Sequence, residues 1–496
     1  MSELPRGWLW TSVSDVTLGV PNVNPQLRPD RHFGYVDISS INNEDYKITQ
    51  VKKVKGSDAP SRARRPIQPD DVLFSNVRTY LRNVAIVRSE SEAEVCSTGF
   101  TVLRSNGAVD PRYLFRWVLT ERFIKAVTPQ QTGTHYPATS DRVVKAQVLP
   151  LPPLNEQRRI VTKLEKLLSR VGAAQARLGT IPRILKRFRQ SVLAAACSGR
   201  LTADWRENNP DVEDAERLLD RLVTERKVAY SEILKEAETN GNRKPKKLLP
   251  DSKPDVDIGG KEFPSTWAIT SVGFLAHVTK LAGFEYTKHI HLQIEGDIPV
   301  VRAQNVQMGE FVEENVKYIS EDVSNLLERS QLHGREILMV FIGAGTGNVC
   351  RAPTNRRWHL APNVAKIDIS GVDPEYLLLY LQSPTGLAST LSFAKATAQP
   401  SLSMQTIRQI AVLLPPLREQ QEIVRRVEAL FKTAAALEAR YGKAKAHVDK
   451  LTQSILAKAF RGELVPQDPN DEPASALLER IQQARNGKVD KRRSRK

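Results

Sequence analysis

The stretch LPPLNEQRRIVTKLEKLL begins at Leu151, and a near copy, LPPLREQQEIVRRVEALF, begins at Leu414, 263 positions later. Sliding the chain by this offset without a gap aligns residues 151–201 with 414–464, and about 21 of the 51 positions are identical. A repeat of this length is the first organising feature of any sequence that carries one. The chain therefore contains two copies of one unit, each with a variable half followed by a better-matched half.

Weaker similarity extends the repeat in both directions. The paired segments are LPRGWLWTSV from Leu4 with FPSTWAITSV from Phe263, DVLFSNVRTYLRNV from Asp71 with EILMVFIGAGTGNV from Glu336, and AERLLDRL from Ala215 with ASALLERI from Ala474. Asp110-Pro111 and Tyr113-Leu114 also recur as Asp373-Pro374 and Tyr376-Leu377, at the same offset of 263. The two copies thus share features outside the well-matched halves.

Each LPP motif predicts the start of a long helix, because the prolines bar the helix from beginning earlier. Apolar residues then recur at i, i+3, i+4 and i+7, which marks one apolar stripe. Residues 154–178 alone would extend about 37 Å as a helix. Two such helices can bury their stripes on each other as an antiparallel coiled-coil pair; the alternative is that each stripe packs only on its own domain. We expect Gly179 and Pro182 to kink or interrupt the first helix.

The variable halves mix short β-rich runs with one or two helices, which predicts a compact domain on a twisted, partly closed sheet. The expected fold class is α+β, with two pseudo-symmetric α/β domains separated by an antiparallel pair of long helices. The expected boundaries are domain 1 at 1–150, helical region 1 at 151–235, a linker at 236–262, domain 2 at 263–413, helical region 2 at 414–485 and a basic tail at 486–496.

The charge balance favours a polyanionic partner. The chain has 73 Lys and Arg against 56 Asp and Glu, a net charge of +17, and nucleic acid is favoured over an anionic membrane surface. The three cysteines lie far apart, so a disulfide framework and a zinc site are not expected. Neither a signal peptide nor a membrane span is apparent. We expect a cytoplasmic protein.

Basic, amide and aromatic side chains cluster in segments that we expect to be loops. Arg, Asn and Gln can make paired hydrogen bonds to base edges, and Lys and Arg contact the phosphate backbone. The DNA-binding candidates of the first copy are Arg62, Arg64, Arg65, Asn76, Arg78, Tyr80, Arg82, Thr134 and His135, and those of the second copy are Arg302, Gln304, Asn305, Thr346, Asn348, Arg351 and Arg356.

One segment has the pattern of an enzyme. ILMVFIGAGTGNV resembles the glycine-rich first motif of S-adenosylmethionine methyltransferases. That fold needs a helix after the turn, yet NVCRAPTNRRWHLAP has two prolines and no apolar period. The aligned first copy has no glycine there, and neither Asn-Pro-Pro nor Asp-Pro-Pro followed by an aromatic residue occurs. A GxxxxGK[ST] phosphate loop and an HExxH zinc motif are also missing. We expect a non-catalytic chain without a catalytic residue, metal or cofactor; a self-sufficient methyltransferase and a coiled-coil scaffold that does not bind DNA remain the alternatives.

Two variable domains, each followed by a helical region that opens with LPPLxEQ, resemble the specificity subunit of type I restriction-modification enzymes, and IPRILKRFRQSVLAAACSGRLTADWR resembles its enterobacterial first subfamily. The resemblance implies a subunit that reads a split, asymmetric sequence in double-stranded DNA, one half-site per domain. It implies two modification (methyltransferase) subunits and restriction (helicase-nuclease) subunits as partners. S-adenosylmethionine, ATP and Mg would then belong to those subunits.

The two helical regions suggest a ruler and a docking surface. A helix of about 37 Å is close to one turn of DNA, 34–36 Å, which separates successive major-groove patches. Charged faces of the helical regions, with the helices expected at 215–235 and 474–485, would dock the modification subunits. The partner-binding candidates are Arg158, Arg159, Lys163, Arg425 and Arg426.

Overall fold

The computed structural model describes residues 3–132, 137–256, 260, 262–394 and 400–493. The chain forms two compact units, residues 1–179 with 441–496 and residues 180–440. Each unit holds one recognition domain and parts of both long helices, α4 (Leu154–Cys197) and α13 (Leu417–Ala459). Both helices begin directly after a Leu-Pro-Pro segment, as the sequence predicts.

The two recognition domains share one topology. In each, a four-stranded sheet packs with a second four-stranded sheet, and an antiparallel pair joins the domain's first strand to its last. The first domain has the strand orders β6-β3-β10-β7 and β2-β11-β8-β9, and the second has β18-β15-β22-β19 and β14-β23-β20-β21. The parallel pairs β3/β10 and β15/β22 occupy the same place in the two copies. The prediction of a single, partly closed sheet is therefore wrong, while the α+β class is confirmed.

The strands of the first domain are β1 (Leu9–Ser12), β2 (Thr17–Leu18), β3 (His32–Val36), β4 (Ile41–Asn42), β5 (Lys47–Ile48), β6 (Lys52–Lys55), β7 (Ala63–Pro66), β8 (Val72–Ser75), β9 (Val84–Ile86), β10 (Ala93–Ser97), β11 (Phe100–Ser105) and β12 (Val148–Leu151). Its helices are α1 (Pro111–Val118), α2 (Glu121–Val127) and α3 (Asp141–Ala146).

The strands of the second domain are β13 (Ala268–Ser271), β14 (Ala276–Lys280), β15 (Ile298–Val301), β16 (Val306–Gln307), β17 (Glu310–Phe311), β18 (Lys317–Ile319), β19 (Gln331–Leu332), β20 (Ile337–Val340), β21 (Val349–Arg351), β22 (Trp358–Leu360), β23 (Val364–Ile369) and β24 (Ala411–Leu414). Its helices are α7 (Val272–Leu275), α8 (Gly283–His289), α9 (Glu321–Leu326), α10 (Pro374–Gln382), α11 (Pro384–Ser392) and α12 (Met404–Gln409).

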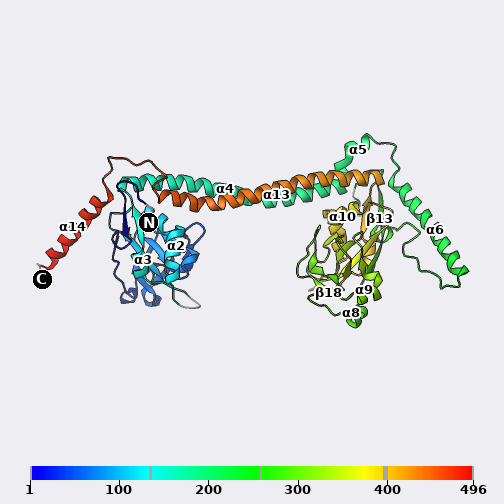
Figure 1. Ribbon diagram of the computed structural model, residues 1–496, viewed down its shortest axis with the longest axis horizontal. Helices are drawn as coiled ribbons and strands as arrows, with labels where there is room; N and C mark the ends of the chain where they lie inside the picture. Colours follow the sequence, from blue (N-terminus) through cyan, green and yellow to red (C-terminus); the bar gives the residue numbers. More distant parts are fainter. Residues whose placement is uncertain (1–2, 133–136, 257–259, 261, 395–399, 494–496) are drawn as a thin grey trace. The chain divides into compact units, whose positions relative to one another are not determined.

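The start of each long helix packs beside the end of the other, so the pair is antiparallel within each unit (Figure 1). In the first unit Gln175 Nε2 donates to Asp449 Oδ1 at 3.4 Å. In the second unit Arg189 Nη2 lies 2.9 Å from Glu438 Oε2, and its guanidinium stacks over Phe431. The ends of the helices also enter the domain cores. The stripes therefore pack both on each other and on the domains.

Pro182 lies inside α4, and the helix is not interrupted there. The prediction of an interruption at Gly179 and Pro182 is wrong. A proline removes one backbone hydrogen bond from a helix interior, and the buried Leu185 and Val192 beyond it hold the helix in place by packing.

Each domain packs against one further helix from the other copy of the repeat. This helix comes after that copy's long helix in the sequence. The helix α6 (Ala215–Thr239) packs on the second domain, where Leu222 lies against Gly371, and α14 (Ala474–Arg493) packs on the first, where Ile481 lies near Gly107. Both glycines have positive φ, +85° and +98°. A Cβ on Gly371 would stand 2.3 Å from Leu222 Cδ2, so only glycine fits under the helix.

Backbone hydrogen bonds repeat the same arrangement at the first residue of each of these helices. The amide of Ala215 donates to Thr266 O at 2.9 Å, and that of Ala474 donates to Gly7 O at 3.0 Å. Among the helices of the described ranges, none combines the length and the apolar character that a membrane crossing requires.

Candidate nucleic-acid interface

Two hairpin loops occupy the same place in the two domains and share only their last residue, Asn83 in the first and Asn348 in the second. In the first domain β8 and β9 are antiparallel and enclose residues 76–83, and in the second β20 and β21 enclose residues 341–348. Each loop forms one isolated bridge to the segment that follows the domain's helices, Val77 to Ala138 and Ile342 to Ser401. The scaffold is therefore shared, and the side chains presented by it are not.

The first loop is fixed at its base by a buried polar network. Asn76 is 6% exposed, and its Oδ1 accepts from Thr101 Oγ1 at 2.6 Å while its Nδ2 donates to Asp141 Oδ1 at 3.2 Å. Arg65 reaches the other oxygen of Asp141, with Nη1 to Oδ2 at 2.6 Å. The structure thus brings Arg65 and Asn76, from two of the sequence clusters, together at Asp141. Asp141 directly follows the third cluster, and the sequence reasoning missed it.

The tip of the first loop is exposed and conformationally strained. Arg78 and Arg82 have φ values of +49° and +53°, in the left-handed region that side-chain-bearing residues avoid. Between them Thr79 is buried, whereas Tyr80 and Leu81 are exposed. The backbone is held by the Arg78 amide, which donates to Pro137 O at 2.8 Å. Strain of this kind persists where the surrounding structure fixes it, and it is common at functional sites.

The second loop uses glycine where the first uses arginine. Gly343 and Gly347 have φ values of +110° and +90°. Thr346 Oγ1 donates to Pro400 O at 2.8 Å, and Asn348 Nδ2 donates to Val306 O at 3.3 Å. The loop leads from β20 into the antiparallel β21 and not into a helix. This is a strand-turn-strand hairpin, unlike the strand-turn-helix of a methyltransferase cofactor motif.

A turn beside this loop holds the candidates at 302–305. Asn305 is buried; its Oδ1 accepts from the Arg302 amide at 3.1 Å, and its Nδ2 donates to Val312 O at 2.8 Å and Glu314 O at 3.0 Å. Every hydrogen-bonding group of this amide is therefore used inside the turn. Gln304 lies on the surface of the same turn.

The remaining arginine candidates are exposed or paired with polar neighbours. Arg62 is exposed. The pairs are Arg64 with Asn24, Arg302 with the carbonyl of Asn315, Arg351 with Glu375 at 3.2 Å, and Arg356 with Glu313 at 2.6 Å. Thr134 and His135 lie outside the residues that the structure describes.

The Glu-Gln pair of each LPPLxEQ motif is buried and binds its own domain. Gln157 Oε1 accepts from the Asp110 amide at 2.7 Å, and Gln420 Oε1 accepts from the Asp373 amide at 2.9 Å. Both Gln side chains also donate to a carbonyl of the preceding Pro-Pro segment. The motif thus attaches the start of the long helix to the Asp-Pro start of α1 or α10. The recurrence of both motifs at one offset was a signal for this contact.

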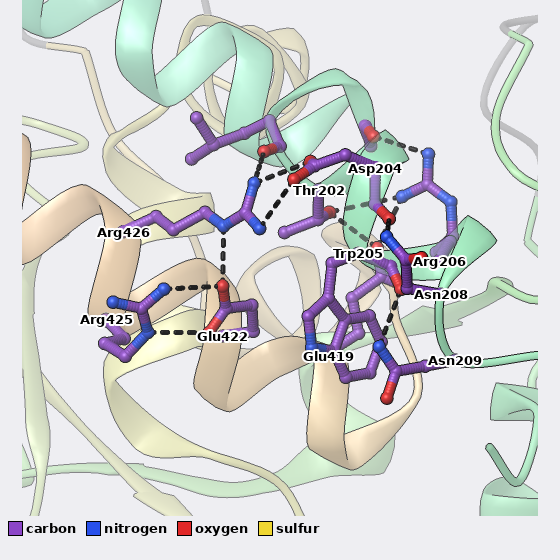
Figure 2. A network of polar contacts seen from close by, with 12 residues as sticks. Thr202, Asp204, Trp205, Arg206, Asn208, Asn209, Glu419, Glu422, Arg425 and Arg426 are labelled. Atoms are coloured by element: carbon purple, nitrogen blue, oxygen red, sulfur yellow. Dashed lines mark hydrogen bonds and ion pairs between the residues drawn. The ribbon is translucent and has the colours of Figure 1, made fainter.

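The two glutamates of the motif have unequal surroundings. Glu419 accepts from Thr202 Oγ1 at 2.6 Å and pairs with Arg206 (Figure 2). It also accepts from Trp267 Nε1 at 2.9 Å. Glu156 accepts from Trp8 Nε1 at 3.0 Å, but its Oε1 is buried without a hydrogen-bond partner. At the repeat offset, Val465 and Pro469 replace Thr202 and Arg206. Burial raises the pKa of the Glu156 carboxyl above its ordinary value.

The five candidate partner-binding residues divide into two groups. Arg159 pairs with Asp471 at 2.6 Å. Arg426 pairs with Asp204 at 2.7 Å (Figure 2), and it also donates to Leu201 O at 2.8 Å. Arg159 thus links the start of α4 to the segment after α13, and Arg426 links the start of α13 to the segment after α4. Arg158, Lys163 and Arg425 are exposed, although Arg425 contacts Glu422 on its own helix.

Two matching recognition domains with unlike loops, joined to two long antiparallel helices, define a two-copy recognition subunit. The family model for the type I restriction modification DNA specificity domain matches residues 24–181 and 264–444, about two thirds of the chain, and the chain belongs to this family. It is a type I restriction-modification specificity subunit, and its relatives are specificity subunits of type I restriction enzymes.

The relatives cover most or all of the chain. The EcoBI specificity subunit of Escherichia coli is 31% identical over 75% of this chain and 72% of its own length. The EcoKI specificity subunit of Escherichia coli (strain K12) is 26% identical over 100% of this chain and 99% of its own. These similarities confirm the resemblance that the LPPLxEQ repeat indicated.

Solved structures confirm the fold. A chain from a study of complex assembly and conformational transition of the type I R-M system matches with a TM-score of 0.64 and 25% identity, covering 93% of this chain and 100% of its own. The HsdS subunit from Thermoanaerobacter tengcongensis matches with a TM-score of 0.57 and 24% identity, covering 93% and 98%.

Proposed function

We propose that this subunit reads a split target in double-stranded DNA, with one half-site contacted by each recognition domain. The observation that carries the proposal is the pair of hairpin loops, 76–83 and 341–348, which are unlike in sequence and held by equivalent bridges on one topology. Unlike loops on a common scaffold read unlike sequences, so the target is asymmetric. The net charge of +17 supports phosphate contacts around both half-sites.

The candidate residues take two roles in this proposal. Asn76, Arg65 and Asn305 use their polar groups inside the protein and position the loops. Base and phosphate contacts fall to side chains that are exposed or partly exposed. These are Arg62, Arg64, Arg78, Tyr80 and Arg82 in the first domain and Arg302, Gln304, Thr346, Asn348, Arg351 and Arg356 in the second. Thr134 and His135 remain candidates from the sequence alone.

The subunit would act as a scaffold in a cytoplasmic complex. Two modification subunits would bind the helical regions, and restriction subunits would join them. Methylation and cleavage, with S-adenosylmethionine, ATP and Mg, would take place on those partners. This chain would supply the choice of sequence and the spacing of the half-sites.

Sequencing of methylated bases in host DNA tests the proposal. A strain with this gene and the modification gene should carry one split, asymmetric methylated motif, and a strain without this gene should lose it. Replacing residues 3–150 with the corresponding domain of the EcoBI relative should change one half of the motif and leave the other half intact. A motif that changes in both halves, or in neither, would contradict the assignment of one half-site to each domain.

The alternatives predict other outcomes in the same experiment. A self-sufficient methyltransferase would methylate DNA without the modification gene. A scaffold that does not read DNA would leave the motif unchanged after any domain exchange.

A further inference from the structure

The tip of the first hairpin loop presents two adjacent hydrophobic side chains to solvent. Tyr80 is 52% exposed and Leu81 is 40% exposed. Across the described part of the chain, no other two consecutive large hydrophobic residues are both exposed. A solitary exposed hydrophobic residue is ordinary, but an adjacent pair on a protruding turn is a feature of contact surfaces.

The protein holds this turn rigidly. Thr79, directly before the pair, is 1% exposed, and its Oγ1 shares a 2.9 Å hydrogen bond with Thr128 Oγ1. The Leu81 carbonyl accepts from Asn43 Nδ2 at 3.0 Å, and the Leu81 amide donates to Arg78 O at 2.8 Å. Both backbone groups of Leu81 are therefore hydrogen-bonded, and the Arg82 amide donates to Thr79 O at 3.0 Å, so the turn is held with both hydrophobic side chains outside the core.

The flanking residues indicate the chemistry of the ligand. Arg78 and Arg82 stand on either side of the pair, and each adopts the strained left-handed conformation. An aromatic ring and an aliphatic side chain between two guanidinium groups suit an apolar stack of bases bordered by phosphates. A protein partner with an apolar groove would not need a cation on both sides.

We propose that Tyr80 and Leu81 form a wedge that enters the base stack of the half-site read by the first domain and unstacks one base step; the inference rests on the proposed function. The second domain has no such wedge, because its loop has Gly345 and Thr346 at the positions that correspond to Tyr80 and Leu81. The distortion is therefore confined to one half-site. Unstacking costs deformation free energy, and the amount depends on how stiff that base step is. The wedge therefore contributes to sequence specificity without touching a base edge.

Fluorescence of 2-aminopurine tests the wedge. The full chain in complex with its modification subunits is bound to duplexes in which 2-aminopurine replaces single bases of the target, with the methylated base pairs left unmodified. The wild-type complex should raise the fluorescence at one step in the first half-site and at none in the second. Tyr80→Ala combined with Leu81→Ala should abolish the increase and weaken binding about 10- to 100-fold.

Two controls isolate stacking from other roles. Tyr80→Phe keeps the ring and should keep the fluorescence increase, so its loss would overturn the wedge in favour of a hydroxyl contact. Leu27→Ala removes a side chain that is 79% exposed elsewhere on the same domain, and it should have no effect.

The remaining outcomes separate the wedge from the proposed function. Specific methylation without any fluorescence increase would overturn the wedge alone. Loss of the modification subunits from the double variant would also overturn it, because the pair would then contact protein. Absence of sequence-specific binding by the wild-type complex would overturn the proposed function itself.

Discussion

The indole Nε1 of Trp8 donates a 3.0 Å hydrogen bond to Glu156 Oε2 in the interior of the first unit. The second unit repeats the contact with Trp267 and Glu419 at 2.9 Å, but there Thr202 and Arg206 bind the other carboxylate oxygen. One buried carboxylate is therefore fully paired and its counterpart is not. A buried polar atom left without a partner costs about 1–3 kcal/mol.

Replacing the buried glutamate by glutamine should lower the stability of the two units unequally. Glu419→Gln leaves the Arg206 guanidinium without its anionic partner and should destabilise the second unit by about 2 kcal/mol. Glu156→Gln keeps an acceptor for Trp8 and should change the first unit by no more than about 1 kcal/mol. Urea titration with brief proteolysis and mass spectrometry reports each unit separately. Equal losses would contradict the difference in pairing.

Glu156 should also make the first unit sensitive to pH. Its pKa in the folded protein is raised above the ordinary value of 4.5, so the folded state binds this proton more tightly than the unfolded chain does. At a pH above the folded-state pKa, the ionised Glu156 carboxylate therefore lowers the free energy of unfolding. This loss of stability disappears as the pH falls below 4.5, where the carboxyl is protonated in both the folded and the unfolded chain. The stability difference between Glu156→Gln and the wild type should shrink from pH 7 to pH 4. A difference that grows over this interval would contradict the shift.

Two substitutions of Arg82 separate the effect of its backbone strain on stability from the effect of its charge on DNA binding. Arg82→Gly should stabilise the first unit by about 1 kcal/mol relative to Arg82→Ala, because only glycine is relaxed at a φ of +53°. Both substitutions remove the charge and should weaken DNA binding to the same extent, with a shallower salt dependence. Binding in a series of salt concentrations provides the measurement. If the alanine variant binds as the wild type does, Arg82 does not contact phosphate.

Charge reversal can separate docking from folding on the helical surfaces. Arg158→Glu, Lys163→Glu and Arg425→Glu alter exposed side chains and should release the modification subunit while leaving the chain folded. Arg159→Glu and Arg426→Glu break internal ion pairs with Asp471 and Asp204 and should destabilise their units. Co-purification and circular dichroism distinguish the two effects. Full retention of the partner by the first three variants would reject this face as the docking surface.

The ruler hypothesis predicts a change in the target itself. Deleting four residues from both α4 and α13 removes about one turn, or about 6 Å, from each helix. The number of unspecified base pairs between the half-sites should then fall by about two, because bases stack about 3.4 Å apart. The methylated motif gives the result directly. An unchanged spacing would reject the ruler, and deletion from α4 alone is a control that should abolish methylation by mismatching the helices.

The repeat in the sequence was sufficient for the two-copy α+β architecture and for the starts of both long helices. It could not reveal which domain receives the helices at 215 and 474, because an offset alignment says nothing about which copy a segment packs against. The continuity of α4 through Pro182 was equally hidden, since the packing beyond Leu185 that supports it is a tertiary property.

The candidate DNA-binding residues show a similar limit. Residue type identified Asn76 and Asn305 as side chains able to read bases, yet both are buried and hold turns together. An amide suits both tasks, and only the fold determines which way it points. The sequence also predicted loops for the basic clusters of the first domain, and this is wrong for Arg64 and Arg65, which lie in strand β7. The structure joins Arg65 and Asn76 through Asp141.

The helix α14 has a consequence for the order of events during synthesis. The first domain needs Phe460, which packs on Tyr113 and Trp117 with ring centroids 5.0 Å away, and it needs Leu478 from α14. Residues 180–440, by contrast, form the second unit without any later segment. At about 5–20 residues per second, the ribosome needs about 15–60 s to proceed from Gly179 to Ala474. The domain that is translated first is therefore the last to be completed, and during that interval its aromatic core is open to chaperones and to other nascent chains.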